Sequence, residues 1–156
     1  MSLPPPADPD FESRVRDSFS RQSFMATIGA ELRHVGPGAA EIHVPFRPDL
    51  CQQHGLFHGG LIGTIADNAA GYASYTLMPA KNSVLTVEYK LNLMAPAQGD
   101  ALEARAQVLR AGRRITVCRA DVFVVTDGLE KLCATALGTF MTLENTSDHS
   151  LGTRAA

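Results

Sequence analysis

The longest stretch with a helical repeat of apolar residues runs from His58 to Met78 (HGGLIGTIADNAAGYASYTLM). At 100° per residue its aliphatic and alanine side chains share one broad face, so the pattern predicts a long helix packed against a core. The opposite face carries small residues and a single acid, Asp67. Because a solvated face would usually carry Lys and Glu, this composition predicts the close approach of another backbone or of a ligand. The apolar face consists of Leu61, Ile62, Ile65, Ala66, Ala69, Ala70, Ala73 and Leu77, and the small face of Gly60, Gly63, Thr64, Asp67, Gly71 and Ser74.

The pattern before the long helix predicts a shorter helix and a strand pair. Asp8 is placed to act as N-cap, with Pro9 at the first helical position. The Gly36-Pro37-Gly38 turn separates two runs of strand type. The expected elements are a helix over Pro9–Met25, strands over Ile28–Val35 and Ala39–Phe46, and a loop over Arg47–Phe57.

After the long helix the apolar residues alternate with a period of two, which predicts strands. The clearest run is Leu85–Leu93, which we expect to be a half-buried strand of clear register. Asp127-Gly128 is a strong hairpin signal. We therefore expect four consecutive antiparallel strands, over Leu85–Leu93, Leu102–Leu109, Ile115–Val125 and Lys131–Leu143.

The order of these elements predicts an α+β fold in which a sheet curls around the long helix and buries it. We expect one domain over residues 9–143, with the shorter helix as an N-terminal addition. Residues 1–8 are rich in Pro, and residues 144–156 are polar and without pattern. We expect the first segment to be disordered and the second to be a frayed tail.

The composition excludes several classes of protein. A length of 156 residues suits one well-buried core. A net charge of −2 with 19% charged residues argues against binding of nucleic acid by bulk electrostatics. No stretch is apolar over the length of a membrane span, and the Pro-rich start lacks the features of a signal peptide. The three Cys are best explained as free thiols, so we expect a cytoplasmic protein.

A spaced motif joins the predicted loop to the long helix. Gln52 is followed by Gly55, then by His58-Gly59-Gly60, and Asp67 comes nine positions after His58. With the order of the elements, this motif resembles the hotdog-fold acyl-CoA thioesterases of the phenylacetyl-CoA and 4-hydroxybenzoyl-CoA thioesterase type. The resemblance runs from about Ile28 to Leu143 and includes weaker matches at Asn92–Ala97 and Leu109–Arg114.

This resemblance implies a role for each matched residue. In similar enzymes the first Gly of the pair donates its backbone N–H to the thioester carbonyl, a role that falls on Gly59. The helix acid, Asp67, acts as general base or nucleophile. The upstream amide, here Gln52 where some relatives have Asn, polarises the carbonyl or positions water. Thr86, where relatives have Ser, orients water. The implied substrate is an acyl-CoA, and no cofactor is implied beyond the coenzyme A of the substrate.

Hydrolysis of a thioester explains why such groups are needed. Negative charge develops on the carbonyl oxygen, and a helix N-terminus supplies unpaired N–H groups and a positive dipole end. Gly59 and Asp67 are eight residues apart, about 12 Å along a helix. Because near-attack distances are about 3–3.5 Å, one chain cannot easily bring both groups to one thioester. Two antiparallel helices across a two-fold axis can do so. We therefore expect a homodimer with sheets joined edge to edge, paired again into a tetramer.

The sequence gives weaker support for a functional role of the other residues near the motif. His58 orients the loop or takes part in catalysis, while Gly60 and Asn68 are candidates for contacting substrate. Arg110, Arg113 and Arg114 flank a predicted turn and are either solvated or bound to the phosphates of coenzyme A. Cys51, His54 and His58 resemble a metal cluster, but no fourth ligand follows at a familiar spacing, so we expect no metal.

Two other function classes compete with a thioesterase. A hotdog hydratase or dehydratase is disfavoured because its His-Phe-Pro loop pattern is absent from the sequence. A non-catalytic acyl-CoA-binding protein is disfavoured because Gln52, Gly59 and Asp67 occur together. Gly63, Gly71 and Ser74 leave room beside Asp67, and Phe57, Tyr72, Tyr75 and Met78 are candidate pocket walls. Since the helix and its leading loop offer no basic partner, we expect medium-chain or aryl acyl groups rather than carboxylated ones.

Overall fold

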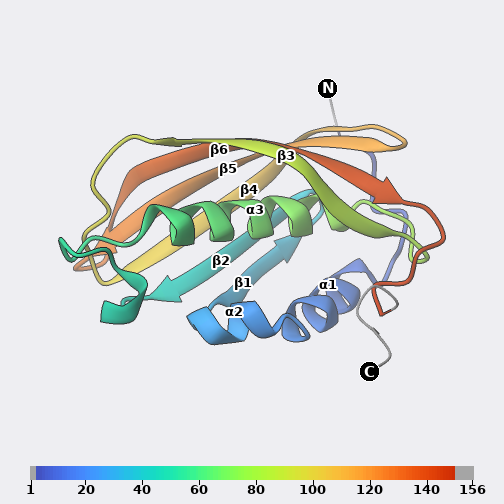
Figure 1. Cartoon of the computed structure of the whole chain (residues 1–156). Helices are drawn as coiled ribbons and strands as arrows, with labels where there is room; N and C mark the ends of the chain where they lie inside the picture. Colours follow the sequence, from blue (N-terminus) through green and yellow to red (C-terminus); the bar gives the residue numbers. More distant parts are fainter. Residues whose placement is uncertain (1–2, 150–156) are drawn as a thin grey trace.

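The computed structural model describes residues 3–149, in which six antiparallel strands form one sheet that curls around helix α3 (Figure 1). The predicted α+β hotdog arrangement is confirmed. Within the described range, none of the helices has the length and apolar character needed to cross a membrane. The elements are α1 (Phe11–Ser20), α2 (Ser23–Ile28), β1 (Glu31–Gly36), β2 (Ala39–Pro45), the 3-10 turn η1 (Pro48–Leu50), α3 (Gly59–Tyr75), β3 (Ser83–Leu93), β4 (Ala101–Ala111), β5 (Ile115–Thr126) and β6 (Leu129–Leu143).

The order of the strands in the sheet differs from their order in the chain. The spatial order is β1-β2-β4-β5-β6-β3, so β3 pairs with β6 rather than with the next strand, β4. The four strands expected after the long helix are all present and antiparallel, but their consecutive order in the chain does not make β3 and β4 neighbours in the sheet. Alternation of apolar residues identifies a strand but carries no information about its partner. As a result, β1 and β3 are the two edges of the sheet.

The turn between β5 and β6 forms as the sequence predicts. Asp127 and Gly128 have positive φ values of 51° and 76°. Two consecutive central residues with φ above zero are the mark of the type I′ turn, whose twist matches that of the flanking strands.

The N-terminal helix is split in two, contrary to the single helix expected over Pro9–Met25. Gln22 adopts an extended backbone conformation, with φ −80° and ψ 97°, and separates α1 from α2. The expected cap is also displaced, because α1 begins at Phe11 after Asp10. Asp8 instead accepts a hydrogen bond from the Asp10 N–H at 3.0 Å. The second helix extends to Ile28, a residue that the pattern places in the first strand.

Both terminal segments make contacts within the described range. Leu3 packs against the core, and the Asp8 carboxylate lies 2.8 Å from Nε of Arg14. Residues 3–8 of the segment expected to be disordered or loosely packed therefore contact the folded chain. Near the other end Asp148 forms an ion pair with Arg21 at 2.7 Å. Residues 1–2 and 150–156 of the expected disordered start and frayed tail lie outside the described residues.

The two faces of α3 have different surroundings. All eight residues of the predicted apolar face are buried in the core. On the small face, a Cβ added to Gly63 would lie 3.2 Å from the Tyr89 hydroxyl oxygen and 3.4 Å from Leu91. Ser74, expected on this open face, is fully buried and donates a hydrogen bond to the Ala70 carbonyl. The glycine at position 63 therefore allows β3 to pass close to the helix.

A β-bulge changes the register of β3. The pairing with β6 shifts between Thr86 and Glu88, so Val87 is an extra residue in this strand. Before the shift Thr86 faces α3, and after it Tyr89 and Leu91 lie against α3. The single alternating register expected for Leu85–Leu93 is therefore wrong. The bulge is what allows one strand to present both a hydroxyl and apolar side chains to the same helix.

Candidate active site

The N-terminus of α3 leaves one backbone donor free. The Nδ1 atom of His58 accepts a hydrogen bond from the Gly60 N–H at 2.9 Å and so caps the helix. The carbonyl of His58 accepts from Leu61 and Ile62. Within residues 3–149, the Gly59 N–H has no acceptor. Of the two glycines, only Gly59 therefore offers an N–H to a ligand.

Gly59 and Gln52 line the same hollow. This hollow has a volume of about 340 Å³. The Gln52 backbone is held in a turn, in which its N–H donates to the Leu56 carbonyl and its carbonyl accepts from Gly55. The structure thus brings together the two residues predicted to act on the thioester carbonyl. The other lining residues are Leu56, Phe57, Ile62, Leu93, Met94, Ala95, Pro96 and Ala97, so the walls are largely apolar.

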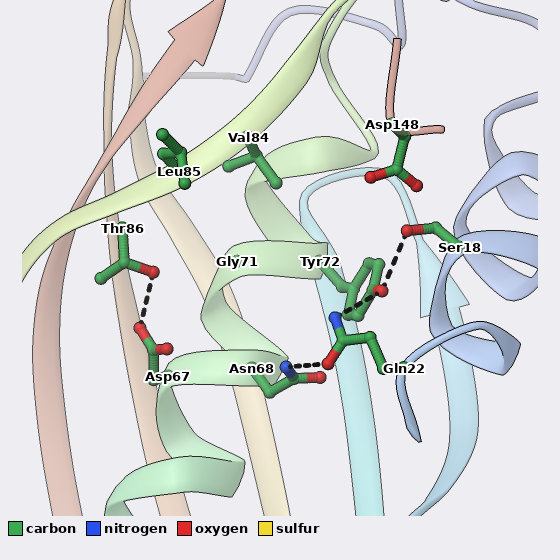
Figure 2. Close-up of a pocket in the computed structure, with 10 residues that line it drawn as sticks. All are labelled: Ser18, Gln22, Asp67, Asn68, Gly71, Tyr72, Val84, Leu85, Thr86 and Asp148. Carbon is green, nitrogen blue, oxygen red and sulfur yellow. Dashed lines mark hydrogen bonds between the residues drawn. The ribbon is translucent and has the colours of Figure 1, made fainter. Parts of the chain in front are cut away.

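Asp67 is partly buried two turns further along α3, where it meets Thr86. The Thr86 hydroxyl, on β3, donates a hydrogen bond of 2.9 Å to Oδ1 of Asp67 (Figure 2). Burial raises the pKa of the Asp67 carboxyl above its ordinary value, and the hydrogen bond from Thr86 opposes that rise. The structure thus places the hydroxyl of Thr86 directly against the carboxylate of Asp67.

A pocket of about 160 Å³ opens beside Asp67. Figure 2 shows that its walls come from α3, from β3, from the N-terminal segment and from the C-terminal segment. No Lys or Arg is among its lining residues in the described part of the chain. The lining residues are Ser18, Gln22, Asp67, Asn68, Gly71, Tyr72, Val84, Leu85, Thr86 and Asp148.

A chain of polar side chains crosses one side of this pocket. The Asn68 side-chain amide donates to Oε1 of Gln22 at 2.9 Å, and Nε2 of Gln22 donates to the Tyr72 hydroxyl at 2.8 Å (Figure 2). The Tyr72 hydroxyl also lies 3.0 Å from Oγ of Ser18. Burial raises the pKa of Tyr72 to about 12, so the phenol stays protonated. We call Asn68, Gln22, Tyr72 and Ser18 the polar wall.

Sequence reasoning found only part of this pocket. Tyr72 and Gly71 line it as expected, whereas Phe57, Tyr75 and Met78 lie elsewhere. The space expected beside Gly63 and Ser74 is filled by protein. Gln22 and Ser18 were missed because a continuous helix over Pro9–Met25 gives no reason to turn Gln22 toward α3. Asp148 was missed because it follows the last element with any pattern.

The arginines predicted to bind coenzyme A lie at the far end of α3. Arg110, Arg113 and Arg114 flank the β4–β5 turn, and Arg113 lines a hollow with Leu77 beyond the helix C-terminus. Because α3 has 17 residues, its two ends are roughly 25 Å apart. One chain therefore does not bring these arginines to Gly59.

The described residues near the motif do not form a cluster of metal ligands. Among residues 3–149, no three His, Cys, Asp or Glu side chains gather closely enough to hold a metal ion. His54 is exposed, and its Nε2 atom lies 3.4 Å from Nε2 of Gln53.

Comparison with known proteins shows which family this arrangement represents. Residues 54–131, half of the 156-residue chain, match the thioesterase superfamily. The structure is similar to a thioesterase family protein from Silicibacter pomeroyi, with 42% sequence identity and a TM-score of 0.85 over 86% of this chain and 98% of the other. It is also similar to a variant of the phenylacetic acid degradation protein PaaI from Thermus thermophilus, with 30% identity and a TM-score of 0.67 over 77% of this chain and 98% of the other.

A relative with a named activity is the 1,4-dihydroxy-2-naphthoyl-CoA hydrolase of Listeria monocytogenes. It is 27% identical over 106 residues, which are 68% of this chain and 84% of that protein. The chain therefore belongs to the thioesterase superfamily, and it is a thioester hydrolase with the hotdog fold.

Proposed function

We propose that this protein hydrolyses acyl-CoA thioesters with the Asp67 carboxylate as general base or nucleophile and the Gly59 N–H as the oxyanion donor. The observation that carries the proposal is the pairing of two features on one helix. Its N-terminus has an N–H without an acceptor within residues 3–149, and two turns later it carries a partly buried carboxylate bound by a hydroxyl. The first feature suits a developing oxyanion and the second suits attack on the carbonyl carbon.

The chemistry can follow either of two routes. As a general base, Asp67 takes a proton from water while the water oxygen attacks the thioester carbon, and the C–S bond then breaks to release the thiolate of coenzyme A and the free acid. As a nucleophile, its carboxylate attacks the thioester carbon, and the C–S bond breaks to release the thiolate of coenzyme A and leave a mixed anhydride, which water then hydrolyses to the free acid and the regenerated Asp67 carboxylate. In both routes the Gly59 N–H stabilises the negative carbonyl oxygen. Gln52 lines the hollow of Gly59 and is placed to polarise the carbonyl or hold water.

The proposed site combines residues of two subunits. Gly59 and Asp67 open onto different hollows of one chain and are about 12 Å apart along the helix. The edge strand β3, which crosses both, exposes apolar side chains, including Val87 at 55% and Leu93 at 58%. An exposed apolar edge strand is a ready template for pairing with a second chain. Pairing of two β3 strands would set two α3 helices antiparallel, with Gly59 of one subunit facing Asp67 of the other.

The pocket beside Asp67 supports a preference for uncharged acyl groups. Val84 and Leu85 give it apolar surface, and no Lys or Arg of the described chain lines it. A carboxylated acyl group would bring an unpaired charge next to Asp67, at a high cost in desolvation. We therefore propose medium-chain or aryl acyl-CoA substrates. Arg110, Arg113 and Arg114 remain candidates for the phosphates of coenzyme A in the dimer or in a tetramer built from two dimers.

The function is tested by incubating the protein with a panel of acyl-CoAs and measuring free thiol with a chromogenic reagent. We expect release of coenzyme A from aryl and medium-chain substrates and little from malonyl- or succinyl-CoA. Asp67→Asn keeps the size of the side chain but removes its basicity, so turnover should fall at least about a hundredfold. Tight binding of acyl-CoA without thiol release would instead identify a non-catalytic binding protein.

A further inference from the structure

The pocket beside Asp67 is smaller than the sites that hold most ligands. Its volume is about 160 Å³, whereas ligand pockets usually enclose roughly 300–1,000 Å³. Figure 2 shows Thr86 and Asp67 on one side of Gly71 and the polar wall on the other. An acyl group that enters beside Asp67 and passes over Gly71 therefore meets the polar wall next.

Gln22 is the central residue of the polar wall. Its side chain reaches from the break between α1 and α2 toward α3, where it lies between Asn68 and Tyr72 (Figure 2). Both ends of the amide are bound, one accepting from Asn68 and the other donating to Tyr72. Because moving the side chain aside would break both hydrogen bonds, Gln22 is a fixed obstacle rather than a flexible one.

The groups around Gln22 are unfavourable for an apolar chain. Oδ1 of Asn68 is buried and has no hydrogen-bond partner within residues 3–149. The Asp148 carboxylate lies on the same side of the pocket as Ser18 (Figure 2). A methylene chain pressed against these groups would exclude water from them without offering a hydrogen bond in return. The wall therefore opposes long acyl tails by its chemistry as well as by its position.

We propose that Gln22 sets the size limit of the acyl group, so that the enzyme favours compact aryl groups and the shortest medium-chain groups, up to about hexanoyl, over longer aliphatic chains. This proposal rests on the proposed function, because it assumes that the acyl group lies beside Asp67. It assigns Gln22 a part in specificity and none in bond breaking. The residue comes from the N-terminal segment outside the strands and helix of the hotdog core, so acyl selection is separated from the catalytic groups.

The first test uses the unmodified protein. We expect kcat/KM to fall at least about tenfold between hexanoyl- and decanoyl-CoA. If the pocket were open at this end, kcat/KM would instead rise about fourfold for each methylene added to the acyl chain. A steady rise through decanoyl-CoA would overturn the size limit while leaving the thioesterase intact. If no acyl-CoA is hydrolysed, the proposed function itself is wrong.

The second test compares Gln22→Ala with Gln22→Met. The first variant shortens the obstacle, and the second keeps its length but removes both hydrogen bonds. We expect Gln22→Ala to raise the ratio of kcat/KM for decanoyl-CoA to that for phenylacetyl-CoA at least about tenfold. In Gln22→Met the ratio should rise less than in Gln22→Ala, because the side chain still fills the space but is no longer held by the two hydrogen bonds. Gln107→Ala, an exposed glutamine on β4, is the matched control.

Two results would overturn the proposal. One is an unchanged substrate ratio in a folded Gln22→Ala protein. The other is an equal rise in both Gln22 variants, since hydrogen bonding rather than size would then control selection. If Gln22→Ala does not fold, the chain-length series of the wild type still tests the size limit, and a Gln22→Met ratio identical to that of the wild type would overturn the part assigned to the hydrogen bonds of Gln22.

Discussion

Replacement of Gly59 by proline removes the proposed oxyanion donor with little other change. Gly59 is the first residue of α3, a position at which proline is favoured because its missing N–H has no partner within the helix. The preceding residue, His58, has ψ 135°, which is the conformation that a following proline requires. A Cβ at position 59 would lie 3.1 Å from the end of the Leu93 side chain, which can move aside. We therefore expect Gly59→Pro to fold.

The expected loss of activity follows from the chemistry of one hydrogen bond. Removal of a single oxyanion donor costs about 10²–10³ in kcat, or ~2.7–4 kcal/mol of transition-state stabilisation. The matched control is Gly59→Ala, which adds the same Cβ but keeps the N–H and should lose much less activity. Both variants are assayed by thiol release from one aryl acyl-CoA, with circular dichroism as the check on folding. A folded Gly59→Pro enzyme with nearly normal kcat would refute the assignment of this N–H.

Three further variants test other parts of the structure. Thr86→Val removes the hydrogen bond that lowers the pKa of Asp67, and because Asp67 must be ionised to act, the acidic limb of the kcat/KM profile should move to higher pH. If the acidic limb of the profile does not move in Thr86→Val, Thr86 has no influence on the ionisation of Asp67 during the reaction. Arg14→Ala should lower the free energy of unfolding, measured in urea, by about 3 kcal/mol because it breaks a largely buried ion pair with Asp8. The control Arg16→Ala breaks an exposed pair with Glu12 and should lower it by less than about 1 kcal/mol. Equal losses would contradict this ranking. Val87→Lys places a charge on the exposed edge strand and should yield an inactive monomer by light scattering. An active monomer would exclude a site shared between subunits.

Much of the fold could be predicted because local patterns determine it. The apolar face of α3 repeats at the period of a helix, and every residue of that face is buried. The Asp127-Gly128 turn requires two positive φ values, which these two residues tolerate better than most. Such features depend on residues that are close together in the sequence, so they can be predicted from the sequence alone.

The predictions that were wrong concern features that depend on contacts between distant parts of the chain. The bulge at Val87 becomes visible only when β3 is paired with β6. The glycine at position 63 was interpreted as space for a ligand, whereas Tyr89 fills that space. A small residue predicts close approach but does not specify what approaches.

The candidate site was predicted from a resemblance, and its pocket was not. The resemblance singled out Asp67, Thr86, Gly59 and Gln52, and in the structure Asp67 contacts Thr86 while Gly59 shares a hollow with Gln52. The polar wall could not have been predicted, because Gln22 enters the pocket only through a break in the N-terminal helix. Nothing in the local composition around Gln22 signals that break.

The central claim is that one active site takes Gly59 from one subunit and Asp67 from the other. It is tested by mixing Gly59→Pro with Asp67→Asn under conditions that allow subunits to exchange. Random exchange makes about half of the dimers mixed, and each mixed dimer has one intact site out of two, so about a quarter of the wild-type activity should return. If instead both groups of a site came from the same chain, every site in the mixture would be defective. Activity that stays at the level of the separate variants after proven exchange would contradict the shared site.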